Sequence, residues 1–101
     1  MRFDWDKNKA KTNQADHQVS FEEATFVFSD EWAIQEFDDS HSDAEENRFT
    51  IIGLAETRIL SVTYSVEIDD RNEEVIRLIS AREARGLDRK DYETNRNEYD
   101  W

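Results

Sequence analysis

The chain has 101 residues and a formal net charge of -12, with 25 Asp and Glu against 13 Lys and Arg. This length supports one hydrophobic core, so we expect residues 1–101 to form a single domain. The charge argues against a broad electrostatic attraction to nucleic acid or to an anionic membrane. The sequence has no cysteine, which excludes disulfides, thiolate nucleophiles and Cys-based metal sites. No apolar run has the length of a membrane span, so we expect a cytoplasmic protein without membrane contact.

The N-terminal part predicts a short strand and two helices. Phe3 and Trp5 alternate with polar neighbours over residues 2–5, which is typical of a strand, and the straight-chain polar residues of 7–14 favour a helix. Ser20 and Glu23 have the S-x-x-E spacing of a capping box, in which the serine hydroxyl accepts a hydrogen bond from the backbone N–H of the glutamate and the glutamate side chain reaches back to the cap. A second helix is therefore expected after Ser20, with its apolar side packed on a sheet.

Four β-rich runs follow, over residues 32–37, 48–55, 58–67 and 74–80. In the third, apolar side chains alternate with Ser and Thr, which is the pattern of a strand buried on one face. Turn-length segments separate the last three runs and predict a hairpin meander. The expected fold is α+β, with a small antiparallel sheet of about four to five strands packed by two N-terminal helices and a C-terminal helix.

The C-terminal helix is expected to begin near Ala81, because Ser80 and Glu83 repeat the S-x-x-E spacing, and to run toward Tyr92 or beyond. Gly86 would interrupt it at a cost of about 1 kcal/mol relative to Ala, and residues 94–101 read as a loose tail. On this helix three arginines would share a stripe suited to phosphate, with surface ion pairing as the alternative. They are Arg82, Arg85 and Arg89.

The charges are unevenly distributed. Residues 16–47 hold 11 acidic residues and no Lys or Arg, whereas residues 2–11 hold four basic and two acidic residues, and residues 77–90 hold five and two. Two basic islands therefore flank an acidic middle. The basic islands could bind phosphate locally. The alternative is that they are simply solvent-exposed surface, since runs of charge commonly form solvated faces.

Two histidines invite a chemical interpretation. His41 stands among Asp38, Asp39 and Asp43, but nothing in that stretch fixes a coordination geometry, so we expect no metal and no other cofactor. His17, placed just before the expected second helix, is a candidate general acid or base, because imidazole titrates near neutral pH. A structural hydrogen-bonding role is the alternative for a lone histidine.

Several motifs occur in one order along most of the chain. They are Phe3–Asp6 (FDWD), His17–Ala24 (HQVSFEEA), Glu45–Phe49 (ExxRF), Ile76–Arg82 (IRLISAR) and Asp88–Glu93 (DRKDYE). Together they resemble the BrnT-like toxins of bacterial type II toxin–antitoxin systems. The resemblance implies a compact fold similar to the RelE ribonuclease toxins and an RNA-cleaving activity that blocks translation. It also implies a BrnA-like antitoxin with a ribbon-helix-helix domain, through which alone the complex would contact operator DNA.

The resemblance also selects site residues. The family's functional positions match His17, Arg48, Arg82 and Arg89, which we predict to be catalytic. They would support metal-independent attack of the ribose 2′-hydroxyl on the adjacent phosphate. The predicted substrate-binding residues are Lys7, Lys9, Arg77, Arg85 and Tyr92. Gln18 stands where the family usually has glycine and Asp16 where lysine is common. The alternative function is therefore a catalytically weak or inactive member that serves as a protein-binding module for its antitoxin.

Overall fold

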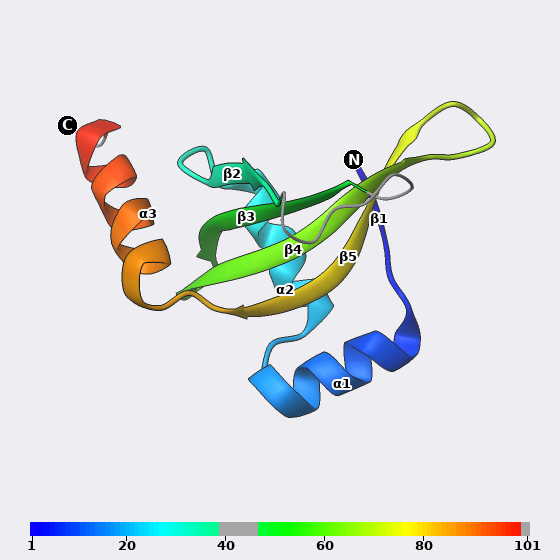
Figure 1. Cartoon of the computed structure of the whole chain (residues 1–101), viewed down its shortest axis with the longest axis horizontal. Coiled ribbons are helices and arrows are strands. Elements are labelled where there is room, and N and C mark those ends of the chain that lie inside the picture. Colours follow the sequence, from blue (N-terminus) through cyan, green and yellow to red (C-terminus); the bar gives the residue numbers. More distant parts are fainter. Residues whose placement is uncertain (39–46, 100–101) are drawn as a thin grey trace.

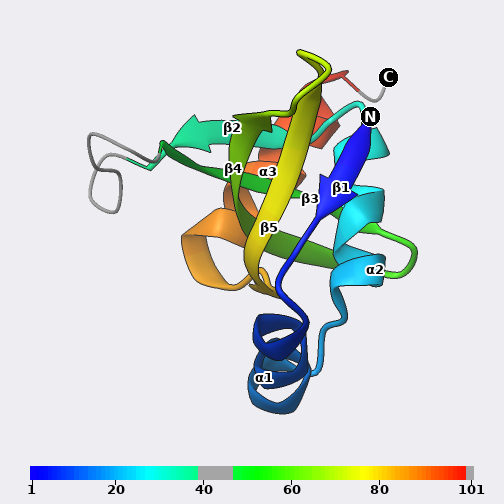
Figure 2. The ribbon, with the colours of Figure 1, turned by 90° about the vertical axis from the view of Figure 1, so that its right-hand side faces the viewer.

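The computed structural model describes residues 1–38 and 47–99, which form a five-stranded sheet with three α-helices and a short 3₁₀ helix (Figures 1 and 2). In chain order the elements are β1 (Arg2–Asp4), α1 (Lys7–His17), α2 (Phe21–Thr25), η1 (Phe26–Ser29), β2 (Ile34–Phe37), β3 (Arg48–Ala55), β4 (Arg58–Ile68), β5 (Glu74–Glu83) and α3 (Gly86–Tyr99). The predicted α+β fold, with two N-terminal helices and one C-terminal helix, is confirmed.

The sheet has the strand order β1-β5-β4-β3-β2. Strands β2 to β5 form the predicted antiparallel meander, but β1 pairs parallel to β5, with Phe3 opposite Ile76. The sheet is therefore mixed and not wholly antiparallel. The alternation of apolar and polar residues shows which face of a strand is buried, but not whether the strand runs parallel or antiparallel to its neighbour. Two parallel neighbours need a long connection, and the chain between β1 and β5 is long enough.

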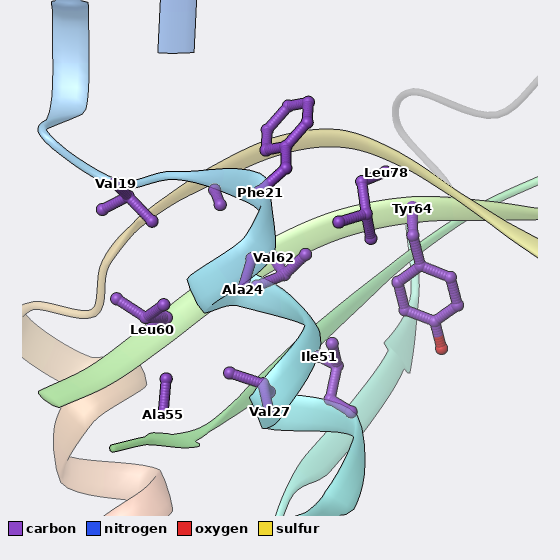
Figure 3. Close-up of a cluster of buried hydrophobic side chains, with 11 residues drawn as sticks. Val19, Phe21, Ala24, Val27, Ile51, Ala55, Leu60, Val62, Tyr64 and Leu78 are labelled. Carbon is purple, nitrogen blue, oxygen red and sulfur yellow. The ribbon is translucent and has the colours of Figure 1, made fainter. Parts of the chain in front are cut away.

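One face of the sheet carries the main core. Helix α2 and η1 lie across β3 and β4 on this face, and their apolar side chains meet those of the strands (Figure 3). The serine half of the predicted capping box of α2 is present, since the backbone N–H of Glu23 donates to Ser20 Oγ at 3.0 Å. The Glu23 carboxylate does not reach back to the cap as expected but binds Arg58. The buried members of this core are Val19, Phe21, Ala24, Val27, Ile51, Ala55, Leu60, Val62, Tyr64, Leu78 and Ala81.

Gly53 allows η1 and the loop after it to lie close to β3. A Cβ atom at this position would lie 2.9 Å from Val27 Cγ1 and 3.1 Å from Asp30 Oδ2. The same carboxylate oxygen of Asp30 accepts the backbone N–H of Leu54 at 2.7 Å. A glycine is therefore needed for this approach, and Asp30 joins the loop to the neighbouring strand.

Helix α1 runs three residues beyond the predicted Gln14, because the chain leaves the helix only at Gln18, where φ is 55°. Its single buried residue is Asn13, whose side-chain amide donates to the carbonyls of Ala81 and Val19. Asn13 Oδ1 in turn accepts the backbone N–H of Ala81 at 3.0 Å. The Asn13 side chain thus continues the hydrogen bonding of the β5 edge past the short β1, and polar contacts attach an otherwise polar helix to the sheet.

The C-terminal region differs from the prediction. Ser80 to Glu83 do not cap a helix but continue β5, where Ser80 lies opposite Thr63 and Arg82 opposite Ser61. Cross-strand pairing therefore overrides the local S-x-x-E signal. Helix α3 begins at Gly86, whose φ of 59° lies in the left-handed region that glycine adopts readily, so Gly86 starts the helix and does not interrupt it.

Residues 94–99, expected to belong to a loose tail, are the last turns of α3. Asn95 donates to the carbonyl of Trp32 at 3.0 Å, and the Arg96 guanidinium lies over the Trp32 ring at 5.4 Å. These contacts hold the helix against the loop before β2. A small cluster of Ile52, Ala84 and Tyr92 joins α3 to the second face of the sheet. Within residues 1–38 and 47–99 no helix is long and apolar enough to cross a membrane.

Candidate functional site

A cavity of about 300 Å³ lies where the end of α1, the start of β4 and the end of β5 meet. Its lining residues are Asp16, His17, Gln18, Arg58, Arg82, Glu83 and Arg85. The cavity brings together three residues predicted from the sequence to have a functional role, His17, Arg82 and Arg85. Three arginines face two carboxylates, so the lining has a formal excess of one positive charge in a chain whose net charge is -12. Such a lining is compatible with an anionic ligand held by local contacts.

His17 is the last residue of α1 and not, as expected, a residue just before the next helix start. Its side chain is exposed to solvent. The left-handed turn at Gln18 follows it directly, and this turn reverses the chain toward α2. His17 is therefore held at the cavity by the end of a helix and is open to solvent and ligand.

Arg58 is a lining residue that the sequence analysis missed. Its Nε and Nη2 atoms donate to the two carboxylate oxygens of Glu23 at 2.7 and 2.6 Å, and Nη2 also donates to the carbonyl of Gln18 at 2.7 Å. These hydrogen bonds from Arg58 hold the pKa of the Glu23 carboxyl below its usual range. Arg58 thus ties α2 and the end of α1 to β4, which makes it a positioning residue for the cavity wall.

The register of the sheet carries the signal that would have identified Arg58. Leu60 lies opposite Glu83, so Arg58 stands across from the chain that leads to Arg85. A bulge between Thr63 and Tyr64 shifts this register by one residue. Because the bulge has no distinctive local sequence, the alternation of the two strands alone could not locate the pairing.

The three arginines predicted to share a helical stripe lie on different elements. Arg82 belongs to β5, Arg85 lies in the link to α3, and Arg89 lies on α3. The Arg82 side chain is 52% exposed and its guanidinium is 3.6 Å from Asp88. Arg89 forms an ion pair with Glu93 at 2.9 Å and does not line the cavity. The predicted stripe was wrong because β5 extends through the residues assigned to the helix.

Arg82 also borders a second hollow of about 320 Å³ on the sheet face that α3 only partly covers. Its residues from the three central strands are Thr50, Ile52, Ser61, Thr63, Ser80 and Arg82. Beyond this hollow, Arg48 and Arg77 lie opposite Ser65 from its two sides. Directly opposed residues of antiparallel strands share a face. We call this surface the polar face; it carries arginines and hydroxyls, and Glu36, Asp38 and Asp88 also line its hollow.

The remaining predicted residues are distributed around the molecule. Lys9 lines a hollow of about 390 Å³ that shares His17 with the cavity, while Lys7 is exposed in the first turn of α1. Arg77 forms an ion pair with Asp4 at 2.9 Å on β1. Arg48 and Arg77 therefore lie on the polar face and not in the cavity itself.

Tyr92 lies in the interior, with 1% of its surface exposed. Its hydroxyl donates to Asp30 Oδ2 at 2.6 Å, and burial together with this carboxylate raises the pKa of Tyr92 to about 12. The hydrogen bond and the packing of the ring between α3 and the sheet account for Tyr92 without a substrate.

No described residues form a group of three or more His, Asp or Glu side chains that could hold a metal ion. Of the metal candidates in the sequence, Asp39, His41 and Asp43 lie outside the described residues, and Asp38 directly follows β2.

Comparison with protein families gives a match over residues 5–87 to the family described as ribonuclease toxin, BrnT, of type II toxin–antitoxin system. A search of curated proteins finds no match. The matched range contains α1, the whole sheet from β2 to β5, and all the residues that line the cavity. The chain belongs to the BrnT family of ribonuclease toxins of type II toxin–antitoxin systems.

Proposed function

We propose that this chain cleaves RNA by a metal-independent reaction at the cavity, and that it acts in the cytoplasm as the toxin of its pair. The observation that carries the proposal is the convergence of His17, Arg82 and Arg85 from a helix end, a strand and a link onto one cavity. Arginine binds phosphate oxygens in pairs, and histidine exchanges protons near neutral pH. The two residue types together are suited to phosphodiester chemistry.

In this reaction the ribose 2′-oxygen attacks the adjacent phosphorus and loses its proton, while the bond from phosphorus to the 5′-oxygen breaks and that oxygen gains a proton. The products are a 2′,3′-cyclic phosphate and a free 5′-hydroxyl. His17 is the group proposed to move a proton, since its imidazole is exposed beside the arginines. Arg82 and Arg85 are proposed to stabilise the negative charge that develops on the phosphorane oxygens.

The polar face is the proposed path of the RNA strand toward the cavity. Arg82 borders both the cavity and the hollow on this face, so the two surfaces are continuous at that residue. Arg48 and Arg77 lie further along the same face, on either side of Ser65. Guanidinium and hydroxyl groups both donate hydrogen bonds to phosphate oxygens. Arg48 therefore has a substrate-binding role in this proposal.

The partner in this proposal is a BrnA-like ribbon-helix-helix antitoxin, which neutralises the toxin and carries the complex to operator DNA. The second candidate function is a weakly active or inactive member that mainly binds this antitoxin. Two carboxylates favour it, because Asp16 and Glu83 line the same cavity as the arginines and would oppose a phosphate there.

The test is cleavage of a long single-stranded RNA by the purified chain, in the presence of EDTA and over a range of salt concentrations. We expect cleavage that survives EDTA and falls as salt rises, because phosphate contacts are screened. Arg82→Ala should lower the rate about 100-fold, the order of magnitude for loss of one charge-stabilising donor. Arg71→Ala is the matched control, since Arg71 is an exposed arginine in the turn before β5.

Full cleavage by Arg82→Ala would exclude the cavity as the reaction centre. Arg89→Ala then tests whether the family resemblance or the cavity identifies the catalytic residues. The resemblance selects Arg89, whereas Arg89 does not line the cavity. Absence of cleavage by the unsubstituted chain, together with tight antitoxin binding, would favour the binding module.

A further inference from the structure

A groove of about 420 Å³ lies on the face that α2 and η1 cover, at the other end of β4 from the cavity. It is lined mainly by apolar side chains and includes Met1, Gln35, Phe49, Tyr64, Val66, Glu74 and Ile76. We call it the apolar groove. Phe28 of η1 packs on Tyr64 with ring centroids 5.0 Å apart, so the core helices end at its border. The alternating pattern of the strands continues past these helices, and its apolar side is left uncovered by them.

Large apolar side chains of this region are unusually exposed for their type. Val66 is 39% exposed, Ile68 on the same side of β4 is 60% exposed, and Met1 is 86% exposed. Phe37 at the end of β2 is 50% exposed and contacts Phe49 edge to face at 5.6 Å. A contiguous apolar surface on a small soluble domain marks an interaction site more often than scattered apolar residues do.

The charge around the groove restricts what can bind. Glu74 is its charged lining residue, and no described Lys or Arg lines it. Gln35 belongs to β2, which lies in the block of residues 16–47 that contains 11 acidic residues and no Lys or Arg. A second copy of this chain would bring another net charge of -12 toward this surface, which electrostatic repulsion opposes. A partner carrying Lys or Arg beside apolar residues is complementary to it.

We propose that the apolar groove is the docking site for the antitoxin, and that the antitoxin segment bound there is amphipathic, with apolar anchors and at least one Lys or Arg near Glu74. The inference rests on the proposed toxin function, since the family description supplies the antitoxin. Aromatic and aliphatic pockets of this kind accept the apolar anchors that dominate binding energy at interfaces.

The location of the groove has a consequence for inhibition. Val66 is eight residues from Arg58 along β4, which corresponds to about 27 Å of strand. Arg82 lies opposite Ser61, nearer along the strand, but its side chain is on the other face of the sheet. A segment confined to the groove therefore leaves His17 and Arg82 uncovered. Neutralisation then requires a further part of the antitoxin to reach the polar face or the cavity.

The experiment uses isothermal titration calorimetry to measure the Kd between the full chain and the BrnA-like antitoxin proposed as its partner. Val66→Glu should weaken binding at least about tenfold, because it introduces a carboxylate into an apolar contact. Leu87→Glu is the matched control, since Leu87 is 75% exposed on α3 and does not line the groove. Glu74→Lys should also weaken binding and reduce its dependence on salt.

Circular dichroism verifies that each variant is folded. If Val66→Glu does not fold, Val66→Ser takes its place in the binding measurement. Unchanged affinity of a folded Val66 variant, or equal weakening by Leu87→Glu, overturns the proposal. Sedimentation would also overturn it by showing a dimer of this chain that Val66→Glu dissociates while the affinity for the antitoxin is unchanged.

RNA cleavage by the isolated variants should equal that of the unsubstituted chain. Absence of cleavage with a clear Val66 effect contradicts only the proposed catalytic function, and cleavage without a Val66 effect contradicts only the docking site.

Discussion

The two faces of the sheet are built from alternate residues of the same strands but are covered differently. On β4, Leu60 and Val62 are buried beneath α2, while Ser61 and Thr63 line the hollow on the other side. The first face is packed with apolar side chains along most of its length (Figure 3). The second is covered by α3 only around Tyr92. One face therefore supplies stability by burial, whereas the other carries polar side chains, of which Arg82 is 52% exposed and open to binding.

The largest contrast between the faces is expected from truncating one side chain on each. Phe21 is fully buried under the first face, so Phe21→Ala should lower the free energy of unfolding by about 3–5 kcal/mol. Thr63→Ala on the polar face should change it by less than about 1 kcal/mol. Urea denaturation measures both values. Similar losses for the two variants would show that the polar face contributes to the core.

A second prediction concerns stability supplied by polar contacts alone. Asn13→Ala removes the hydrogen bonds to Ala81 and Val19 and leaves their buried backbone groups without partners. Because each of these three groups costs about 1–3 kcal/mol, the loss should be at least about 3 kcal/mol and comparable with that of Phe21→Ala. Asn13→Asp keeps the acceptor for the Ala81 N–H but places a carboxylate oxygen against the carbonyls of Ala81 and Val19, so its loss should be at least as large as that of Asn13→Ala. A loss below about 1 kcal/mol would mean that α1 is held in another way.

A third prediction concerns the contact between α3 and the sheet at high pH. Burial and Asp30 raise the pKa of Tyr92 to about 12, above the ordinary tyrosine value near 10. The protonated hydroxyl is the form that folding favours, so its stabilisation is complete below pH 10 and is lost as pH rises toward 12. Between pH 9 and about 12, the free energy of unfolding should therefore fall less steeply with pH for Tyr92→Phe than for the unsubstituted chain. Parallel curves would show that Tyr92 ionises as in the unfolded chain.

The smallest expected effect is at Ser65. Its Oγ is buried between the strands and forms no hydrogen bond within the described residues. Ser65→Ala should therefore leave the free energy of unfolding within about 0.5 kcal/mol of the original value or raise it, since no hydrogen bond is lost. A loss above about 1 kcal/mol in urea denaturation would reveal a bond to water or to another group. Such a loss would also show that side chains of the polar face contribute to stability.

Features of the fold that depend on residues close together in the sequence were predicted better than features that depend on residues far apart. The cap at Ser20 and the alternation of β4 are local, and both were predicted correctly. The second S-x-x-E pattern, at Ser80, has the same local form but lies in β5. Its pairing with Thr63 decides the outcome, and residues distant in sequence supply that pairing. Identical local signals thus gave one correct and one incorrect boundary.

The site shows the same limit. Residue type and family resemblance selected His17, Arg82 and Arg85, which meet in one cavity, but the same reasoning selected Arg89 and Tyr92, which lie elsewhere. Assigning the arginines to one helix gave the wrong geometry. Their true neighbours depend on the end of β5 and on the left-handed start of α3 at Gly86.

The sequence by itself determined the family, the α+β class, the antiparallel meander and the two-sided character of its strands, because periodicity and caps are encoded within a few residues. Tertiary structure alone decided the parallel placement of β1 and the attachment of α1 through Asn13 to Ala81, which is 68 residues away. It also decided which arginines share the cavity with His17. These features depend on strand register and on contacts between distant residues, which no local pattern records.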